Sequence, residues 1–248
     1  MNVLVACEES QVVCKAFREK GHEAYSCDIL PCSGGHPEWH IKGDVLSILN
    51  PMCFSVLLTG TPTGIPLSDV VVEERKEINF YTMDGKFHTI EGRWDLIIAH
   101  PPCTFMSKAG ARWMFPKAGQ MDFDRYAQAM KAKAFFMEFY NADCEKIVIE
   151  NPVPLRCVVL PPPTQKIQPY EFDELGEHPY SKATLLWIKG LPKLVPTTPK
   201  NKPVGTWMPS NTGGYSRGQG GGRGIAHDAV TASRTFTGVG KTMAEQWG

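Results

Sequence analysis

The feature that most constrains this fold is the alternation of short apolar runs with amphipathic patterns between residues 3 and 149. Apolar runs at residues 3–6, 24–27, 94–99 and 146–149 predict strands, and patterns with helical spacing at residues 10–20 and 124–140 predict helices. Strands that alternate with helices of these lengths favour a sheet whose strands are parallel and whose two faces are covered by helices. We therefore expect an α/β fold with a doubly wound, mostly parallel sheet.

The two predicted helices have different signals. In residues 10–20, Val12, Val13, Ala16 and Phe17 share one face, and Gly21 ends the pattern. The helix at residues 124–140 is expected to bury Tyr126, Ala129, Met130, Ala134, Phe135 and Met137.

Two segments depart from this alternation within what we take to be a single domain, residues 1–248. Residues 70–90 alternate as strands around Asp84-Gly85, a hairpin signal, and predict a two-stranded β-ribbon inside an insertion at residues 51–93. Residues 210–224 are rich in glycine, serine and arginine and predict a mobile loop, within an irregular region at residues 193–233.

Charge and cysteine content limit the class of protein. Lysine plus arginine equals aspartate plus glutamate, at 26 each, so the chain lacks the basic surplus of proteins that grip duplex DNA tightly by themselves. No apolar run reaches the length of a membrane span, and the first residues predict a strand rather than a signal peptide. Eight cysteines without a repeating spacing indicate reduced thiols, so we expect a cytoplasmic protein without a membrane partner.

One group of residues has a spacing that superficially suits zinc: Cys27, Cys32, His36 and His40. Cys27, however, belongs to the strand that precedes Asp28, which takes it away from a local site. We therefore predict no metal.

Polar residues follow several of the predicted strands. In a parallel sheet the strands end at one edge, where ligands bind. Glu8 and Ser10 follow the first strand, Asp28 follows the second, and Asp44 precedes another apolar segment. An acid that ends the second strand can accept hydrogen bonds from ribose hydroxyls, and Asp44 could receive the exocyclic amine of an adenine. Each acid alone is as well explained by a helix cap or an ordinary loop.

The next two strand ends carry a cysteine and a glutamate. Cys103 follows Pro101-Pro102, a turn that stiffens the backbone, and Glu150 ends the strand after it. Alone, a cysteine here is more often a small buried apolar residue, and a glutamate is more often an ion-pair partner. Together they can face one site.

These motifs resemble the cytosine-C5 DNA methyltransferase family, with its Pro-Cys and Glu-Asn-Val motifs, and above all small phage-encoded proteins described as DNA cytosine methyltransferase-like. The resemblance covers nearly the whole chain, apart from the insertion and the glycine-rich loop. It is carried by residues 3–8, 26–28, 99–104, 149–152, 185–192, 234–236 and 246–248.

The resemblance implies a class I S-adenosylmethionine-dependent methyltransferase fold and a known chemistry. Cys103 as a thiolate would add to C6 of a cytosine in DNA, Glu150 would donate a proton or hydrogen bond to N3, and a base within a duplex would be flipped out. S-adenosylmethionine is the implied cofactor, with contacts from Cys7, Glu8, Ser10, Asp28, Ile29, Asp44, Val45 and Pro101. The pyrimidine would be held by Asn151, Lys182, Thr184 and Arg234.

The chain departs from the family in three places. Residues 6–10 replace the glycine-rich turn that follows the first strand, and Lys182 and Thr184 stand where the family has an Arg-x-Arg pair. About fifty residues separate Trp187 from the C-terminal motif, too few for a conventional target-recognition domain. The substrate could thus be DNA or a pyrimidine at the nucleotide level.

Two other functions remain open. A Pro-Pro turn after the fourth strand also occurs in enzymes that methylate an exocyclic amine, a reaction that needs no thiol. The altered first turn and the missing arginine pair also suit a degenerate methyltransferase fold that binds cofactor or nucleic acid without catalysis.

Overall fold

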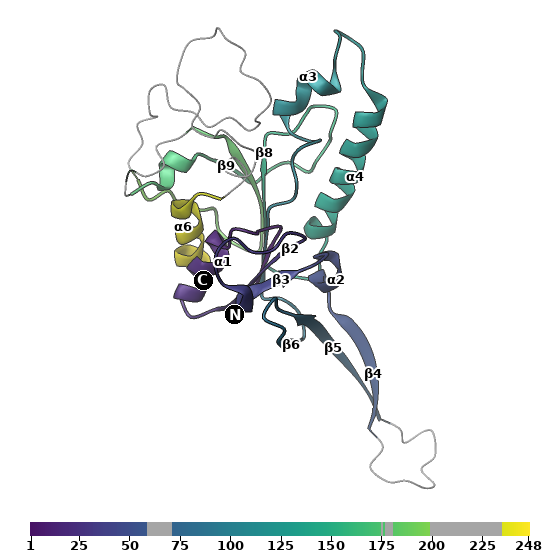
Figure 1. The fold of residues 1–248 in the computed structure, drawn as a ribbon, viewed down its shortest axis with the longest axis vertical. Helices are drawn as coiled ribbons and strands as arrows, with labels where there is room; N and C mark the ends of the chain where they lie inside the picture. Colours follow the sequence, from purple (N-terminus) through teal and green to yellow (C-terminus); the bar gives the residue numbers. More distant parts are fainter. Residues whose placement is uncertain (59–70, 175, 177–180, 199–234) are drawn as a thin grey trace.

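A computed structural model describes residues 1–58, 71–174, 176, 181–198 and 235–248. Its main sheet has seven strands in the order β3-β2-β1-β7-β8-β10-β9 (Figure 1). The bounds are β1 Asn2–Ala6, β2 Glu23–Asp28, β3 His40–Lys42, β7 Leu96–Ala99, β8 Ile147–Pro152, β9 Gln165–Ile167 and β10 Thr184–Lys189. The predicted α/β class and the mostly parallel sheet are confirmed.

One strand of this sheet, β10, runs opposite to the other six. The pairs β3–β2, β2–β1, β1–β7 and β7–β8 are parallel, whereas β10 is antiparallel to both β8 and β9. β9 therefore runs in the direction of β8, and β10 is inserted between them. Alternation along the sequence does not predict this insertion, because strand order is a property of the sheet as a whole.

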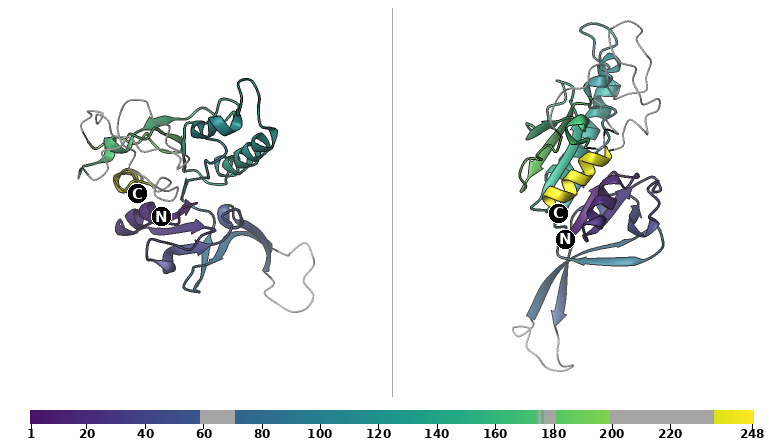
Figure 2. Two further views of the ribbon diagram at one scale, coloured as in Figure 1. Left: turned by 45° about the horizontal axis from the view of Figure 1, so that its top comes forward. Right: turned by 90° about the vertical axis from the view of Figure 1, so that its left-hand side faces the viewer.

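Helices cover both faces of the sheet (Figure 2). On one face, α1 (Val12–Glu19) and α6 (Thr237–Trp247) pack against alternate strand residues such as Val5 and Ile98. On the other face, α4 (Phe123–Tyr140) packs against Ile97 and Ile149. Neighbouring residues of β7 thus belong to opposite halves of the core, as the period of two requires.

The buried face of α4 differs from the predicted one. Ala129, Phe136 and Phe139 are its buried residues, while Ala134, expected in the core, is exposed. Phe136 meets the Trp187 ring edge-on, with 5.0 Å between ring centroids. An amphipathic pattern with many apolar residues leaves the helix rotation open, and the shape of the partner strand then decides it.

The C-terminal helix begins at a close backbone contact. A Cβ atom on Gly238 would lie 1.9 Å from the carbonyl oxygen of Phe172 in η4 (Pro169–Phe172), so only glycine fits there. Gly240, two residues further on, packs against Val12 and Val13 of α1. These contacts bring the end of the chain alongside its first helix.

The insertion forms a second, antiparallel sheet of three strands, β4 (Met52–Leu58), β5 (Val71–Tyr81) and β6 (Phe87–Glu91). The hairpin expected around Asp84-Gly85 joins β5 to β6, with Gly85 at φ +86°. The two strands predicted within residues 70–90 are present, and a third strand of the insertion, β4, pairs along β5. β4 lies before the segment that carries the hairpin signal, so the local pattern of residues 70–90 does not include it.

The end of β5 near the β5–β6 turn packs against residues of the main sheet and of the segment before β7. Phe80 lies 5.0 Å from Tyr25 and 5.9 Å from Trp94, measured between ring centroids. Lys76 of β5 contacts Asp143, which lies four residues before the start of β8 and so marks the amino edge of the main sheet. In Figure 1, β4 and β5 project away from the main sheet on this side.

Other elements are short: η1 (Pro37–Trp39), α2 (Leu46–Leu49), η3 (Lys108–Gly110) and α3 (Ala111–Met114). Within the described ranges, no helix is long and apolar enough to cross a membrane. The glycine-rich loop predicted at residues 210–224, and most of the irregular region 193–233, fall outside the described residues.

Candidate functional site at the carboxyl edge of the sheet

The strand order places a crevice between the carboxyl ends of β1 and β7. From β1 the chain builds outward through β2 and β3, and then returns to start β7 on the other side of β1. In open α/β sheets, ligands bind at such a reversal. The turn after β1 and the loop after β7 therefore frame the candidate site, and the His100 amide extends the pairing by donating to the Ala6 carbonyl, at 2.9 Å.

The turn after β1 has a glycine-like backbone without glycine. Cys7 and Gln11 both have φ of 59°, the left-handed region that residues with a Cβ rarely adopt. The Gln11 side chain donates to the His36 carbonyl and accepts from the His36 amide, at 2.8 and 3.1 Å. Glu9 and Ser33 add a side-chain contact and a backbone hydrogen bond. The loop after β2 thereby holds the strained turn in place.

Glu8 lies inside the protein and caps α1. Its two carboxylate oxygens accept the amides of Val13 and Cys14, at 2.7 and 3.2 Å, which otherwise have no intrahelical partner. Burial raises the pKa of Glu8, although the positive charge of His100 and the two amides oppose that shift. Both carboxylate oxygens of Glu8, a residue predicted to contact the cofactor, thus accept hydrogen bonds from α1. Ser10, predicted to have the same role, is buried.

Asp28 and Asp44 come together near Cys7. Each uses one oxygen as a local cap, Asp28 to the Leu30 amide and Asp44 to the Leu46 amide, at 2.9 and 3.0 Å. Burial is the main cause that raises the pKa of Cys7, and the negative charges of both aspartates raise it further. The three side chains, from three strand ends, therefore face one region.

Two apolar residues flank these aspartates. Ile29 is 74% exposed, unusual for an isoleucine at a strand end, whereas Val45 is buried beneath α2. An exposed isoleucine beside two carboxylates offers a flat apolar contact next to hydrogen-bond acceptors, a combination typical of sites for a heteroaromatic ring.

The most tightly coupled pair in the crevice is His100 and Glu150. His100 Nδ1 lies 2.8 Å from Glu150 Oε2, and the side chains are only 10% and 15% exposed. Thr235 Oγ1 lies 3.4 Å from the same nitrogen, and His100 Nε2 is buried without a hydrogen-bond partner in the described part of the chain. A buried polar atom left without a partner is rare in proteins and marks a place where a ligand can donate or accept.

His100 and Glu150 each shift the pKa of the other. Burial lowers the pKa of His100, but the hydrogen bond and charge of Glu150, with Glu8, outweigh it and raise that pKa overall. Burial raises the pKa of Glu150, and the His100 hydrogen bond and charge, with Lys182, lower it overall. Each partner of the pair therefore favours the charged form of the other.

The charges of Glu150 and Lys182 also act on the Cys103 thiol. Burial is the largest cause that raises the pKa of its thiol, Lys182 lowers it, and Glu150 raises it, with a net rise. The positive charge of Lys182 lowers the pKa of Cys103, of Glu150 and of His100. These four side chains therefore lie close to one another. The Cys103 carbonyl accepts the amides of Met106 and Ser107, which fixes the turn that carries the thiol.

Asn151 and Pro101 fasten the Cys103 loop to β8. The Asn151 side chain is buried and donates to the Pro101 carbonyl, at 2.8 Å, while its own oxygen is buried without a hydrogen-bond partner among the described residues. Asn151, predicted to bind substrate, and Pro101, predicted to bind cofactor, therefore contact each other. This contact ties the loop that carries Cys103 to the end of β8, the strand that carries Glu150.

Lys182 and Thr184 line a narrow pocket together with Glu150, Thr235 and Phe236. The Lys182 ammonium lies 5.4 Å from the centre of the Phe236 ring, and the buried Thr184 hydroxyl donates to the Lys182 carbonyl at 3.3 Å. Arg234, the fourth residue predicted to bind substrate, falls outside the described residues.

Sequence reasoning missed His100 and Thr235 as members of the site. His100 was visible as the residue that directly follows the best predicted strand, next to Pro101-Pro102. Its partner is fifty residues away on β8, so only the pairing of β7 with β8 reveals the ion pair.

The cysteine and histidine group after β2 has structural roles. His40 is buried, with its two ring nitrogens 2.8 Å from Ser26 Oγ and 3.0 Å from the Leu30 carbonyl, and His36 stacks on Trp39 at 3.9 Å. No group of three or more metal-binding side chains occurs in the described ranges.

Comparison of the chain with protein-family models, with curated proteins and with solved structures gave no match. The proposal for function therefore rests on the motifs and on the geometry of the crevice.

Proposed function

We propose that this protein is an S-adenosylmethionine-dependent methyltransferase that methylates C5 of a cytosine in DNA through Cys103. The observation that carries the proposal is the meeting of Cys103 and Glu150 at the carboxyl ends of the adjacent strands β7 and β8. A nucleophile and an acid–base group are the two side chains this chemistry requires.

The sheet supports the same reading. One antiparallel strand inserted between the fifth and sixth parallel strands is the arrangement expected of the class I fold that the sequence motifs imply. The described residues also fit the cofactor. Among the described residues, Asp28 and Asp44 each have one oxygen without a hydrogen bond, suited to ribose hydroxyls and an adenine amine, and Ile29 offers an apolar surface beside them.

The proposed reaction needs four steps from the protein and substrate. Cys103 as a thiolate adds to C6, so that an electron pair moves to C5. C5 then takes the methyl group, which S-adenosylmethionine supplies when bound. A base removes the C5 proton, and the returning electron pair expels the Cys103 thiolate, which restores the ring.

We propose a different source for the acid of this reaction. The sequence motifs assign proton donation at N3 to Glu150, but the hydrogen bond and charge of His100 lower the pKa of Glu150 and favour its carboxylate form. In our proposal the Glu150 carboxylate accepts a hydrogen bond from the cytosine amine, and the proton held by His100 passes through Glu150 to N3 as Cys103 adds to C6, which neutralises the charge that the addition places on the ring.

In this proposal Lys182 stabilises the thiolate form of Cys103. Burial keeps the Cys103 pKa high, so a thiolate needs a nearby cation, and Lys182 is the group whose charge lowers that pKa. In this proposal Lys182 partly takes over the role of the missing arginine pair.

The experiment is trapping with 5-fluorocytosine. Fluorine at C5 blocks the elimination that frees Cys103, so wild-type protein with S-adenosylmethionine and a substituted oligonucleotide should form a covalent complex. Cys103→Ala should form none, while Cys53→Ala, at an exposed cysteine in β4, should form it normally. Mass spectrometry of nucleosides from treated DNA identifies the methylated base. Methylation without a trapped complex would rule out the C5 mechanism.

One observation favours a second candidate. The raised pKa of Cys103 leaves a neutral thiol in the free protein, which suits methylation of an exocyclic amine, where no thiolate is needed. A Cys103→Ser variant with full activity and an N-methylated product would establish this alternative.

A further inference from the structure

The surface that follows Cys103 combines cations with exposed aromatic rings. Residues 96–121 include Lys108, Arg112 and Lys117 and no acidic residue, in a chain whose total charge is zero. Trp113 in α3 is 37% exposed and Phe115 beside it 38%. We refer to residues 105–117, with Arg125 from α4, as the aromatic-basic surface.

Arginines hold the tryptophan of this surface in place. The Arg112 guanidinium lies 4.0 Å from the centre of the Trp113 ring, and that of Arg125 lies 5.5 Å from Trp113 and 5.1 Å from Phe105. Arg125 also donates to the Thr104 carbonyl, at 2.9 Å, and no carboxylate contacts it among the described residues. Its Nε is buried without a hydrogen-bond partner there as well. The cation is therefore not neutralised within its own surroundings.

The surface is continuous with the candidate site. Ser107 and Lys108 are bound to the segment after β8, where the Lys108 amide donates to the Val153 carbonyl at 2.8 Å. A cleft of about 300 Å³ lies between residues 107–109 and 181–183, at the lower end of the range for small-molecule sites. Lys182 lines both this cleft and the pocket beside Glu150.

We propose that the aromatic-basic surface binds an unpaired strand of DNA and directs its target base through this cleft. The inference rests on the proposed function for the identity of the target, but the binding itself does not. A ring such as Trp113 can stack only on a base that is free of its own stack, and cations beside it hold the phosphates. The zero net charge argues against a long duplex, which needs many phosphate contacts.

The test is fluorescence anisotropy with a labelled single-stranded oligonucleotide of about 16 nucleotides and with its duplex. Neither assay contains S-adenosylmethionine. We expect tighter binding to the single strand. Trp113→Ala should weaken it between about fivefold and a hundredfold, the range for loss of one base–aromatic stack. The matched control is Phe87→Ala, an exposed aromatic at the turn into β6, which should bind normally.

The cations give an independent measurement. A Lys108→Ala/Lys117→Ala variant should lower the slope of log affinity against log salt by about 0.7 for each phosphate contact removed. Both lysines are exposed, so this variant should fold even if Trp113→Ala does not.

Several results would overturn the inference. They are duplex binding at least as tight as single-strand binding, unchanged affinity in both variants, or a dimer that Trp113→Ala dissociates without any effect on DNA. Failure of the proposed function is recognised separately. If single-strand binding depends on Trp113 but no base is methylated, the surface stands and the enzyme assignment fails. If DNA is methylated equally by wild type and Trp113→Ala, the enzyme assignment stands and the proposed role of the surface fails.

Discussion

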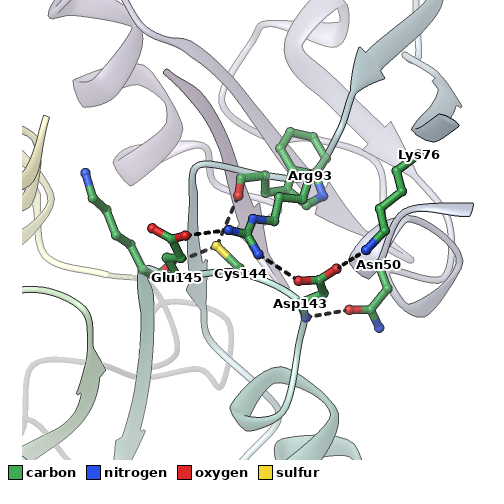
Figure 3. Close-up of polar contacts among 8 residues, drawn as sticks. Asn50, Lys76, Arg93, Asp143, Cys144 and Glu145 are labelled. Atoms are coloured by element: carbon green, nitrogen blue, oxygen red, sulfur yellow. Dashed lines mark hydrogen bonds and ion pairs between the residues drawn. The ribbon is translucent and has the colours of Figure 1, made fainter. Parts of the chain in front are cut away.

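At the amino edge of the main sheet the charged side chains are exposed and paired with one another, whereas at the carboxyl edge they are buried and incompletely paired. Figure 3 shows the amino edge, where Arg93 contacts Asp143 and Glu145, and Lys76 contacts Asp143 from the second sheet. The hydrogen bond from Arg93 and the charge of Lys76 lower the pKa of Asp143, as expected for a surface ion pair.

At the carboxyl edge, burial raises the pKa of Glu8, Cys7 and Cys103, and an atom of His100 has no hydrogen-bond partner among the described residues. Two residues of the turn after β1 also adopt the left-handed backbone region. Groups that cost stability are concentrated at this edge, and functional sites are where proteins tolerate such costs. The five predictions below test this contrast.

The largest effect is expected for Glu150→Gln. The amide keeps the shape but cannot share a proton with His100, so methyl transfer should fall by roughly 10²–10⁴-fold. Asp143→Asn, the matched change at the amino edge, should leave transfer of labelled methyl groups to DNA unchanged. Equal rates in the two variants would remove Glu150 from the reaction.

The second effect is on stability. His100→Ala leaves Glu150 buried without its partner, so the free energy of unfolding should fall by roughly 3–5 kcal/mol. Arg93→Ala should have no measurable effect, because its ion pairs are exposed to water. Urea unfolding followed by circular dichroism measures both, and a His100→Ala protein as stable as wild type would contradict the buried ion pair.

The third prediction concerns the pH range of that stabilisation. The folded pKa of His100 is raised, so its contribution is complete below the ordinary value of 6.5 and is lost as pH rises through the raised pKa. The folded pKa of Glu150 is lowered, so its contribution is complete above the ordinary value of 4.5 and is lost as pH falls through the lowered pKa. The stability difference between wild type and a His100→Ala/Glu150→Gln variant should therefore be widest between pH 4.5 and 6.5.

The fourth prediction concerns the thiol. Lys182→Met removes the charge that lowers the Cys103 pKa, so alkylation of Cys103 by iodoacetamide should slow by about tenfold per unit of pKa change. Lys76→Met at the amino edge should not alter it. Peptide mass spectrometry separates Cys103 from the other seven cysteines.

The smallest effect is expected from backbone strain. Cys7→Gly places glycine at φ 59° and should raise the free energy of unfolding by less than about 1 kcal/mol, since the chain also gains entropy when unfolded. Gly85→Ala in the β5–β6 turn, at φ +86° in open space, should lower it by about 1 kcal/mol. Changes of the same sign in both variants would mean that the two turns are not comparable.

The sequence by itself determined the elements. The strands at residues 24–27 and 146–149 and the helix at residues 124–140 form within a few residues of their predicted bounds, because periodicity of apolar residues reflects local geometry. It also placed Asp28, Asp44, Cys103 and Glu150 at one edge, since parallel strands end together.

Tertiary structure decided the features that depend on contacts between distant parts of the sequence. The insertion of β10 between β8 and β9, the third strand of the inserted sheet, and the buried face of α4 each depend on a partner far away in sequence. The same holds for the His100–Glu150 pair and for Glu8, whose carboxylate oxygens accept the first amides of α1. Residue type limits which chemistry is possible, but burial and neighbouring charges, which only the folded chain provides, set where the proton resides.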